Sequence, residues 1–177
     1  CLANPGTLFL RQTTSLQRVS TLEKLGAAEV RAVVHTFRDA LLAHREPINR
    51  LNVYPVPDGD TGTNMSLTLG SVVDALADVP DDITDVVKAV SHGSLMGARG
   101  NSGVILSQVL RGFVGSFGET GGLDGPGLAT ALRASSDAAY QAVMRPVEGT
   151  ILTVVRASAE AAEATAATAE GPDNSQV

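Results

Sequence analysis

The sequence predicts an all-α fold, a bundle of antiparallel helices whose connecting loops gather at one end. Aromatic residues make up only 3% of the chain and Trp is absent, whereas Ala, Leu and Val are plentiful, a composition typical of packed helices. Apolar residues also recur at helical spacing along most of the chain. No alternation of Val and Ile is long enough to predict a sheet.

The first helix is predicted from Ala27 to Glu46. Its apolar residues are spaced by three or four positions and therefore share one face: Val30, Val33, Val34, Phe37, Leu41 and Leu42. Pro47 is expected to end this helix, because an interior proline removes a backbone donor. The segment from Leu51 to Thr63 then holds two prolines, two glycines and two aspartates, which predicts an ordered loop.

The remaining periodicity predicts five more helices, about six in total. They cover residues 64–77, 82–95, a stretch that begins at Val104, 128–144 and 150–168. Asp81 or Asp82 is expected to cap the helix at residues 82–95. Glycine-rich segments at 97–103 and 115–127 are predicted as loops.

The 177 residues suit one globular domain, predicted here over residues 21–170. Residues 1–20 mix Pro, Gly, Thr and Ser without periodicity, which predicts a flexible leader or a non-native arm. Residues 171–177 are predicted to form a polar tail.

Composition and charge exclude several functional classes. The net charge is -6 and no dense cluster of Lys or Arg is present, so nucleic acid is not an expected partner. No apolar run approaches the ~20 residues that span a bilayer, so no membrane span is expected. The single cysteine, Cys1, is expected to form no intrachain disulfide, which fits a cytoplasmic protein.

The first loop has the residue types of a metal-nucleotide site. Asp58 and Asp60 flank Gly59, whose freedom to bend lets both carboxylates converge. Mg²⁺ prefers carboxylate oxygens and keeps positions open for water and phosphate, while Asn52 and Asn64 offer neutral oxygens. An EF-hand is excluded because its fifth and twelfth loop positions hold Gly62 and Leu69. A capping turn, in which both carboxylates bind backbone amides, remains the alternative.

The second loop, Gly97 to Gly103, has the residue types of an anion site. It precedes a predicted helix, where free amides and the positive end of the helix dipole attract phosphate. It lacks the Gly-Lys-Ser/Thr ending of a P-loop. Arg99 offers a cation that would offset charge on a transferring phosphoryl group, with an ordinary salt bridge as the alternative. Together the two loops predict phosphoryl transfer.

The segment Leu51-Asn-Val-Tyr-Pro-Val-Pro-Asp-Gly-Asp-Thr-Gly-Thr-Asn-Met65 resembles the signature of the DhaL-type (dihydroxyacetone kinase L-like) domain of the bacterial fatty acid kinase ATP-binding subunit. Further blocks resemble the same family at residues 93–108, 111–113, 139–144 and 146–153. The resemblance covers about residues 22–165 and implies an all-α barrel that holds ATP and two Mg²⁺ ions at one end.

Site residues follow from the resemblance position by position. It implies that Asp58 and Asp60 bind metal; related domains have a third aspartate where this chain has Val53, which leaves Asn52 as the nearest polar candidate. The resemblance further implies that the nucleotide contacts one block of Thr61, Gly62, Thr63 and Asn64 and a second block of Gly100, Asn101, Ser102 and Gly103. Thr150 and Ile151 would flank the adenine.

The resemblance also implies a reaction and a partner. A fatty-acid-binding partner subunit would present the carboxylate of its fatty acid to ATP, giving an acyl phosphate. Two alternatives stay open: a dihydroxyacetone (glycerone) kinase-type phosphotransferase that acts on a small hydroxylated substrate, and a non-enzymatic helical regulatory or interaction module. Compared with the family, the domain is expected to lack its closing C-terminal helices and to be inactive alone. It is also expected to form a homodimer over the apolar surface left uncovered.

Overall fold

The computed structural model describes residues 22–53, 57–118 and 121–169, and these form an all-α fold. The prediction of fold class is confirmed, since the described residues contain helices and one isolated backbone bridge between Leu25 and Leu123 but no strand. The helices are α1 (Ala27–Ala43), α2 (Arg45–Leu51), α3 (Thr61–Leu76), α4 (Ile83–Met96), α5 (Gly100–Val114), α6 (Gly125–Gln141) and α7 (Ile151–Ala169). The predicted leader at 1–20 and tail at 171–177 lie outside the described residues.

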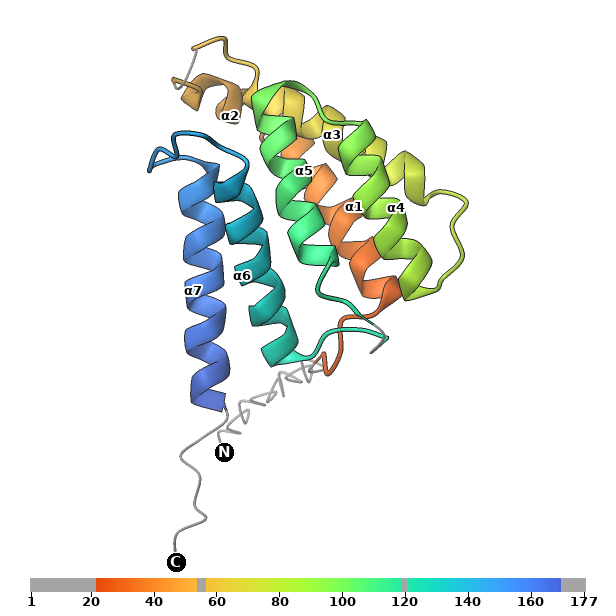
Figure 1. Ribbon diagram of the computed structural model, residues 1–177. Coiled ribbons are helices and arrows are strands. Elements are labelled where there is room, and N and C mark those ends of the chain that lie inside the picture. The colour runs from red at the N-terminus through yellow and green to blue at the C-terminus, as the bar shows by residue number, and fades with distance from the viewer. Residues whose placement is uncertain (1–21, 54–56, 119–120, 170–177) are drawn as a thin grey trace, which may run out of the picture.

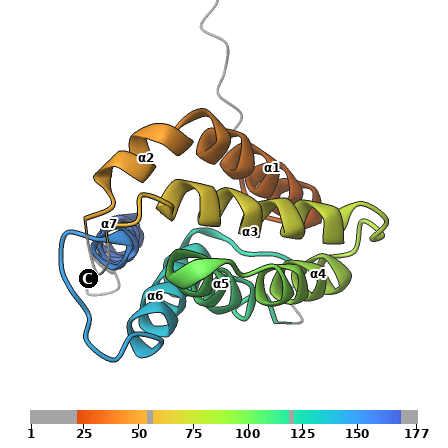
Figure 2. The same ribbon diagram turned by 90° about the horizontal axis from the view of Figure 1, so that it is seen from above.

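The helices form two layers, with α7 along one side. Figure 2 shows α1 and α3 in one layer and α4, α5 and α6 in a row beneath them. The helix α3 packs against α1, α2, α4 and α5, and α6 packs between α5 and α7. In Figure 1 the start of α5, the start of α7 and the helix α2 all lie at the upper end. The loops that carry the predicted site therefore gather at one end, as the sequence suggests.

The core lies between α3, α4 and α5. Its most buried side chains follow the predicted helical spacing, with Leu69, Val72 and Leu76 on α3 and Val86 and Val90 on α4. Burying one such side chain contributes about 1.5–3 kcal/mol to folding. This apolar contact, rather than helix propensity, holds the helices in register.

Three helices begin earlier than predicted. The helix α3 starts at Thr61 instead of Asn64, and α5 starts at Gly100 instead of Val104. The helix α6 starts at Gly125 instead of Leu128, because Asp124 accepts a hydrogen bond from the Gly127 amide at 2.8 Å. The predicted phosphate-binding residues from Gly100 onward therefore form a helical turn rather than a loop.

Pro47 does not end the first helix, which corrects the sequence interpretation. The helix α1 already stops at Ala43, and Pro47 is the third residue of α2, a helix that the sequence analysis missed. Proline is tolerated there because amides in the first turn have no intrahelical acceptor. The predicted cap of α4 is confirmed for Asp82, whose Oδ1 accepts from the Thr84 amide at 2.9 Å.

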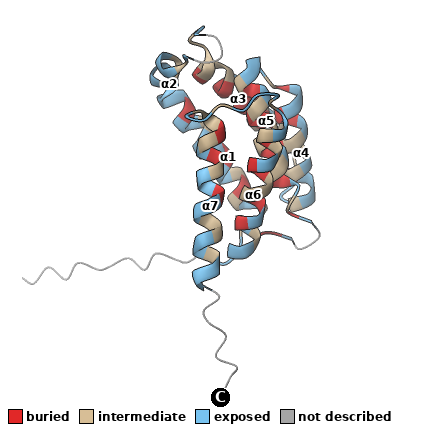
Figure 3. Cartoon of the chain, turned by 60° about the vertical axis from the view of Figure 1, so that its left-hand side comes forward, coloured by how far each residue is buried: buried red, intermediate tan, exposed pale blue. Residues whose placement is uncertain are grey.

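An apolar groove of about 330 Å³ runs beside α7. It is lined by residues of α1, α5, α6 and α7: Phe37, Leu106, Val109, Leu132, Ile151, Val154, Val155 and Ser158. Figure 3 shows that α7 turns many exposed residues to the outside.

Within the described residues, no helix is both long and apolar enough to cross a membrane. The expected homodimer stays a prediction.

Candidate nucleotide-binding site

The structure brings the two predicted loops together at the N-termini of α3 and α5. The Ser102 hydroxyl donates a hydrogen bond to the Thr61 hydroxyl at 3.3 Å, although the two residues are 41 positions apart. The Asn64 side chain lies directly beside Gly100, because a Cβ placed on Gly100 would be 2.3 Å from Asn64 Nδ2. Residues from both blocks therefore share one surface at the upper end of Figure 1.

Both helix starts present backbone amides to that surface. In α5 the first amide bonded within the turn is that of Gly103, which donates to the Arg99 carbonyl at 2.9 Å. The amides of Gly100, Asn101 and Ser102 precede it and have no intrahelical acceptor. In α3 the corresponding bond runs from the Asn64 amide to the Asp60 carbonyl at 2.8 Å. Two positive helix ends side by side favour an anion between them.

Glycine is required at two positions of the α5 start. Gly100 has a φ of +57°, in the left-handed region that favours glycine. A Cβ on Gly103 would lie 2.4 Å from Thr68 Oγ1. The buried Thr68 hydroxyl accepts a hydrogen bond from the Arg99 amide at 3.2 Å and donates one to the Asn64 carbonyl at 2.8 Å. Thr68 thus fixes α5 against α3, a role that the sequence analysis did not assign.

The helix α2 supplies a second residue that the sequence analysis missed. Asn49 Oδ1 accepts from the Thr63 amide at 3.1 Å, and Asn49 Nδ2 donates to the Thr63 hydroxyl at 3.1 Å. The backbones of α2 and α3 approach closely here, since a Cβ on Gly62 would be 2.4 Å from the Arg45 carbonyl oxygen. Thr61, Gly62 and Thr63 are thereby held between α2 and α5. An Asn two residues after a proline carries no sequence signal for this role.

The acidic turn precedes α3 directly. Gly59 adopts a φ of +67° between the two aspartates. Asp58 Oδ1 accepts a hydrogen bond from Asn52 Nδ2 at 2.6 Å, so two of the predicted metal ligands are neighbours. Asp60 is the N-cap residue of α3, yet its side chain makes no capping hydrogen bond, unlike Asp82 and Asp124 at their helices. The alternative in which the Asp60 carboxylate binds backbone amides is therefore not observed.

Arg99 occupies the N-cap position of α5 and is exposed. Its guanidinium Nη1 donates to the Ala98 carbonyl at 3.2 Å. Among the ion pairs that join described residues, none includes Arg99. The salt-bridge alternative for Arg99 is therefore not observed, and its charge lies next to the shared anion surface.

Thr150 directly precedes α7 and Ile151 is its first residue. The start of α7 lies at the same end of the molecule as the start of α5 (Figure 1). The Thr150 hydroxyl donates to the Val147 carbonyl at 2.8 Å and accepts from the Leu152 amide at 3.3 Å, so it caps α7. Ile151 is half-buried and lines the apolar groove. Between described residues, no hydrogen bond joins this pair to the starts of α3 or α5. The pair therefore lies at the same end of the molecule as the other predicted residues, without a hydrogen bond to them.

The sequence of this chain is similar to a protein family and to several known bacterial proteins. The DAK2 domain family model matches residues 55–176, more than half of the chain. An uncharacterized protein of Staphylococcus saprophyticus is 52% identical over 120 residues, covering 67% of this chain and 22% of that protein. Protein YloV of Bacillus subtilis is 48% identical over 135 residues, covering 72% of this chain and 24% of YloV.

This chain therefore spans less than a quarter of the length of these curated relatives. The family match runs from the acidic turn through α3, α5 and α7, so it includes the residues that converge at the helix starts. The helical fold, the DhaL-like sequence blocks and the family match agree, and the chain belongs to the DAK2 domain family, a kinase-related family of nucleotide-binding modules.

Proposed function

We propose that this domain binds Mg-ATP where α3 and α5 begin and transfers the γ-phosphoryl group to the carboxylate of a fatty acid. The acid is presented by a partner subunit; its carboxylate oxygen forms the new bond to phosphorus, ADP leaves, and the product is an acyl phosphate. The observation that carries the proposal is the convergence of two helix N-termini beside Asp58 and Asp60, the two aspartates on either side of the positive-φ Gly59. ATP supply places such a reaction in the cytoplasm.

Each group of residues has a distinct role in this proposal. The free amides of Gly100, Asn101 and Ser102, with Gly103 beside them, contact the phosphates from the α5 side. Thr61, Gly62, Thr63 and Asn64 contact the phosphates from the α3 side. The start of α7, at Thr150 and Ile151, flanks the adenine. Ile151 supplies an apolar surface there, which suits the face of a base.

The residues of the acidic turn fit divalent metal. Within the described residues, no group of three His, Cys, Asp or Glu side chains forms a complete metal site. Mg²⁺ is commonly held by one or two carboxylates together with phosphate oxygens and water, so Asp58 and Asp60 suffice as charged ligands. The side-chain Nδ2 of Asn52 donates its hydrogen bond to Asp58, so the side-chain Oδ1 of Asn52 is left to serve as a third ligand. Two Mg²⁺ ions would neutralise charge on the β- and γ-phosphates.

The acceptor determines what the chain must supply. A fatty acid carboxylate is already ionised near pH 7, so its attack on the γ-phosphorus requires no general base. Catalysis then rests on positioning and on charge neutralisation. Arg99, exposed at the α5 N-cap and outside the ion pairs described above, is placed to offset negative charge on the transferring group.

A matched set of aspartate variants tests the site. By isothermal titration calorimetry, the unchanged domain should bind Mg-ATP, and Asp58→Ala and Asp60→Ala should abolish binding. Asp82→Ala is the control, because Asp82 caps α4 and lies outside the site. Wild-type affinity in both Asp58→Ala and Asp60→Ala would overturn the proposal.

The acceptor is tested separately with labelled ATP. Transfer of the γ-label to the fatty acid that the partner subunit carries, and not to dihydroxyacetone, is the expected result. Transfer to dihydroxyacetone would establish the glycerone kinase-type alternative. Nucleotide binding without transfer to either acceptor would instead favour a regulatory module. The full-length protein is the right sample, since this chain spans only part of its relatives.

A further inference from the structure

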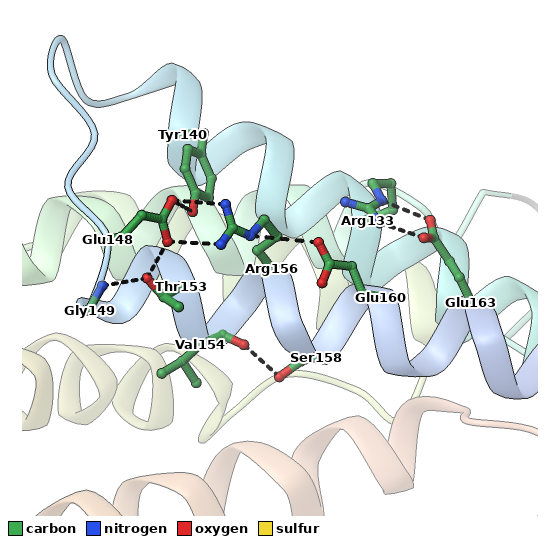
Figure 4. Close-up of polar contacts among 10 residues, drawn as sticks. All are labelled: Arg133, Tyr140, Glu148, Gly149, Thr153, Val154, Arg156, Ser158, Glu160 and Glu163. Carbon is green, nitrogen blue, oxygen red and sulfur yellow. Dashed lines mark hydrogen bonds and ion pairs between the residues drawn. The ribbon is translucent and has the colours of Figure 1, made fainter.

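The carboxylate of Glu148 lies at the centre of a hydrogen-bonded cluster between α6 and α7 (Figure 4). Its Oε1 accepts from the Tyr140 hydroxyl at 3.0 Å and from Arg156 Nη1 at 2.8 Å. Its Oε2 accepts from the Thr153 hydroxyl at 2.6 Å and from Arg156 Nη2 at 2.9 Å. The Arg156 guanidinium also lies over the Tyr140 ring, 5.8 Å from its centroid.

This cluster fixes the segment that enters α7. Tyr140 belongs to the last turn of α6, whereas Thr153 and Arg156 belong to the first turns of α7. The Thr153 hydroxyl additionally accepts from the Gly149 amide at 2.8 Å, and Gly149 adopts a φ of +77°. Glu148 and Gly149 immediately precede Thr150 and Ile151. The backbone that leads to this pair is therefore held from both helices at once.

Stability alone does not account for the cluster. The side chains of Glu148 and Arg156 are 55% and 40% exposed, and ion pairs in such positions contribute little to folding. The same two helices are also joined by Arg133 and Glu163, whose side chains form a two-bond ion pair farther along α7. What distinguishes the Glu148 cluster is its place, directly before the residues proposed to flank adenine.

We propose that Glu148 is a positioning residue that holds the start of α7 in the geometry that receives the adenine base. The inference rests on the proposed nucleotide site. Without Glu148, the segment at 147–151 would have to be ordered when the nucleotide binds, and that ordering costs affinity. The loss should fall on ligands that carry adenine and spare ligands that carry only phosphates.

Binding of two probes separates these contributions. Mg-ATP and Mg-tripolyphosphate are titrated into the unchanged domain, Glu148→Gln and Tyr140→Phe. Glu148→Gln should weaken Mg-ATP binding about tenfold, equivalent to about 1.4 kcal/mol, and leave Mg-tripolyphosphate binding unchanged. Tyr140→Phe removes one donor to the same carboxylate and should shift Mg-ATP binding in the same direction by a smaller factor.

Glu163→Gln is the matched control, because it breaks an ion pair between the same helices away from the loop. It should leave the binding of both probes unchanged. Equal Mg-ATP affinity in Glu148→Gln and the unchanged domain would overturn the positioning role, as would an equal loss for both probes. Failure of the unchanged domain to bind either probe would instead overturn the proposed nucleotide site itself.

Discussion

At the scale of single residues, the α5 start depends on the absence of a side chain at Gly103. A Cβ there would lie 2.4 Å from the buried Thr68 hydroxyl, which joins Arg99 to Asn64. Gly103→Ala should therefore destabilise the domain by about 1–3 kcal/mol, as overpacking does. Gly70→Ala is the control, since no atom lies within 4 Å of a Cβ added there. Because alanine suits a helix interior better than glycine, this change in α3 should raise the free energy of unfolding by about 0.5–1 kcal/mol. Urea unfolding measures both, and equal effects would contradict the steric argument.

The Glu148 cluster also predicts a pH dependence. The hydrogen bond from Thr153, then that from Tyr140, lowers the pKa of Glu148 below its ordinary value. Its contribution to stability is therefore present above the pKa of the unfolded carboxyl and is lost as pH falls through the lower folded value. Thermal unfolding should show a difference between the unchanged domain and Glu148→Gln at pH 7 that shrinks in acid. A difference that persists below the folded pKa would contradict this assignment.

At the scale of elements, two helix caps of the same residue type are expected to behave differently. Asp82 accepts hydrogen bonds from two amides of α4, so Asp82→Ala should cost about 0.5–2 kcal/mol. Asp60 stands at the N-cap of α3 without a side-chain capping bond, so Asp60→Ala should cost little in urea unfolding while it abolishes Mg-ATP binding. A large loss of stability in Asp60→Ala would show that its carboxylate serves the helix rather than a ligand.

Apolar spacing was sufficient to predict six of the seven helices in the described residues, because the buried faces of helices such as α1, α3, α4 and α5 repeat at that spacing. It could not predict where α3 and α5 begin, since the first turns of both helices contain glycines and polar residues instead of apolar ones. Asp58, Asp60 and the glycines of α5 could be proposed as site candidates from residue type alone. Asn49 and Thr68 were not, because their hydrogen bonds join segments that are distant in sequence.

At the scale of the whole molecule, hydrogen bonds join α1 to the end of α3, opposite the proposed site. Arg31 of α1 donates to the carbonyls of Leu76, Val79 and Pro80 where α3 ends, at 2.7, 2.5 and 2.9 Å. The 16 residues of α3 separate this contact from Thr61, a span of about 24 Å at 1.5 Å per residue. Sites so far apart and without shared partners contribute independently to stability.

Arg31→Ala should therefore lower the free energy of unfolding by about 1.5–3 kcal/mol without changing Mg-ATP affinity, since hydrogen bonds from a charged donor to these carbonyls are lost. Asp81→Asn is the control, because Asp81 pairs with Arg31 through a side chain that is 68% exposed, and its loss should cost little.

Saturating Mg-ATP extends this prediction to the whole fold. At a hundred times the dissociation constant, ligand should add about 2.7 kcal/mol to the unfolding free energy of both the unchanged domain and Arg31→Ala, and nothing to Asp60→Ala. Denaturant unfolding with and without Mg-ATP measures all three increments. A smaller increment in Arg31→Ala would mean that the two ends of α3 are coupled, because stability and binding would then depend on the same packing.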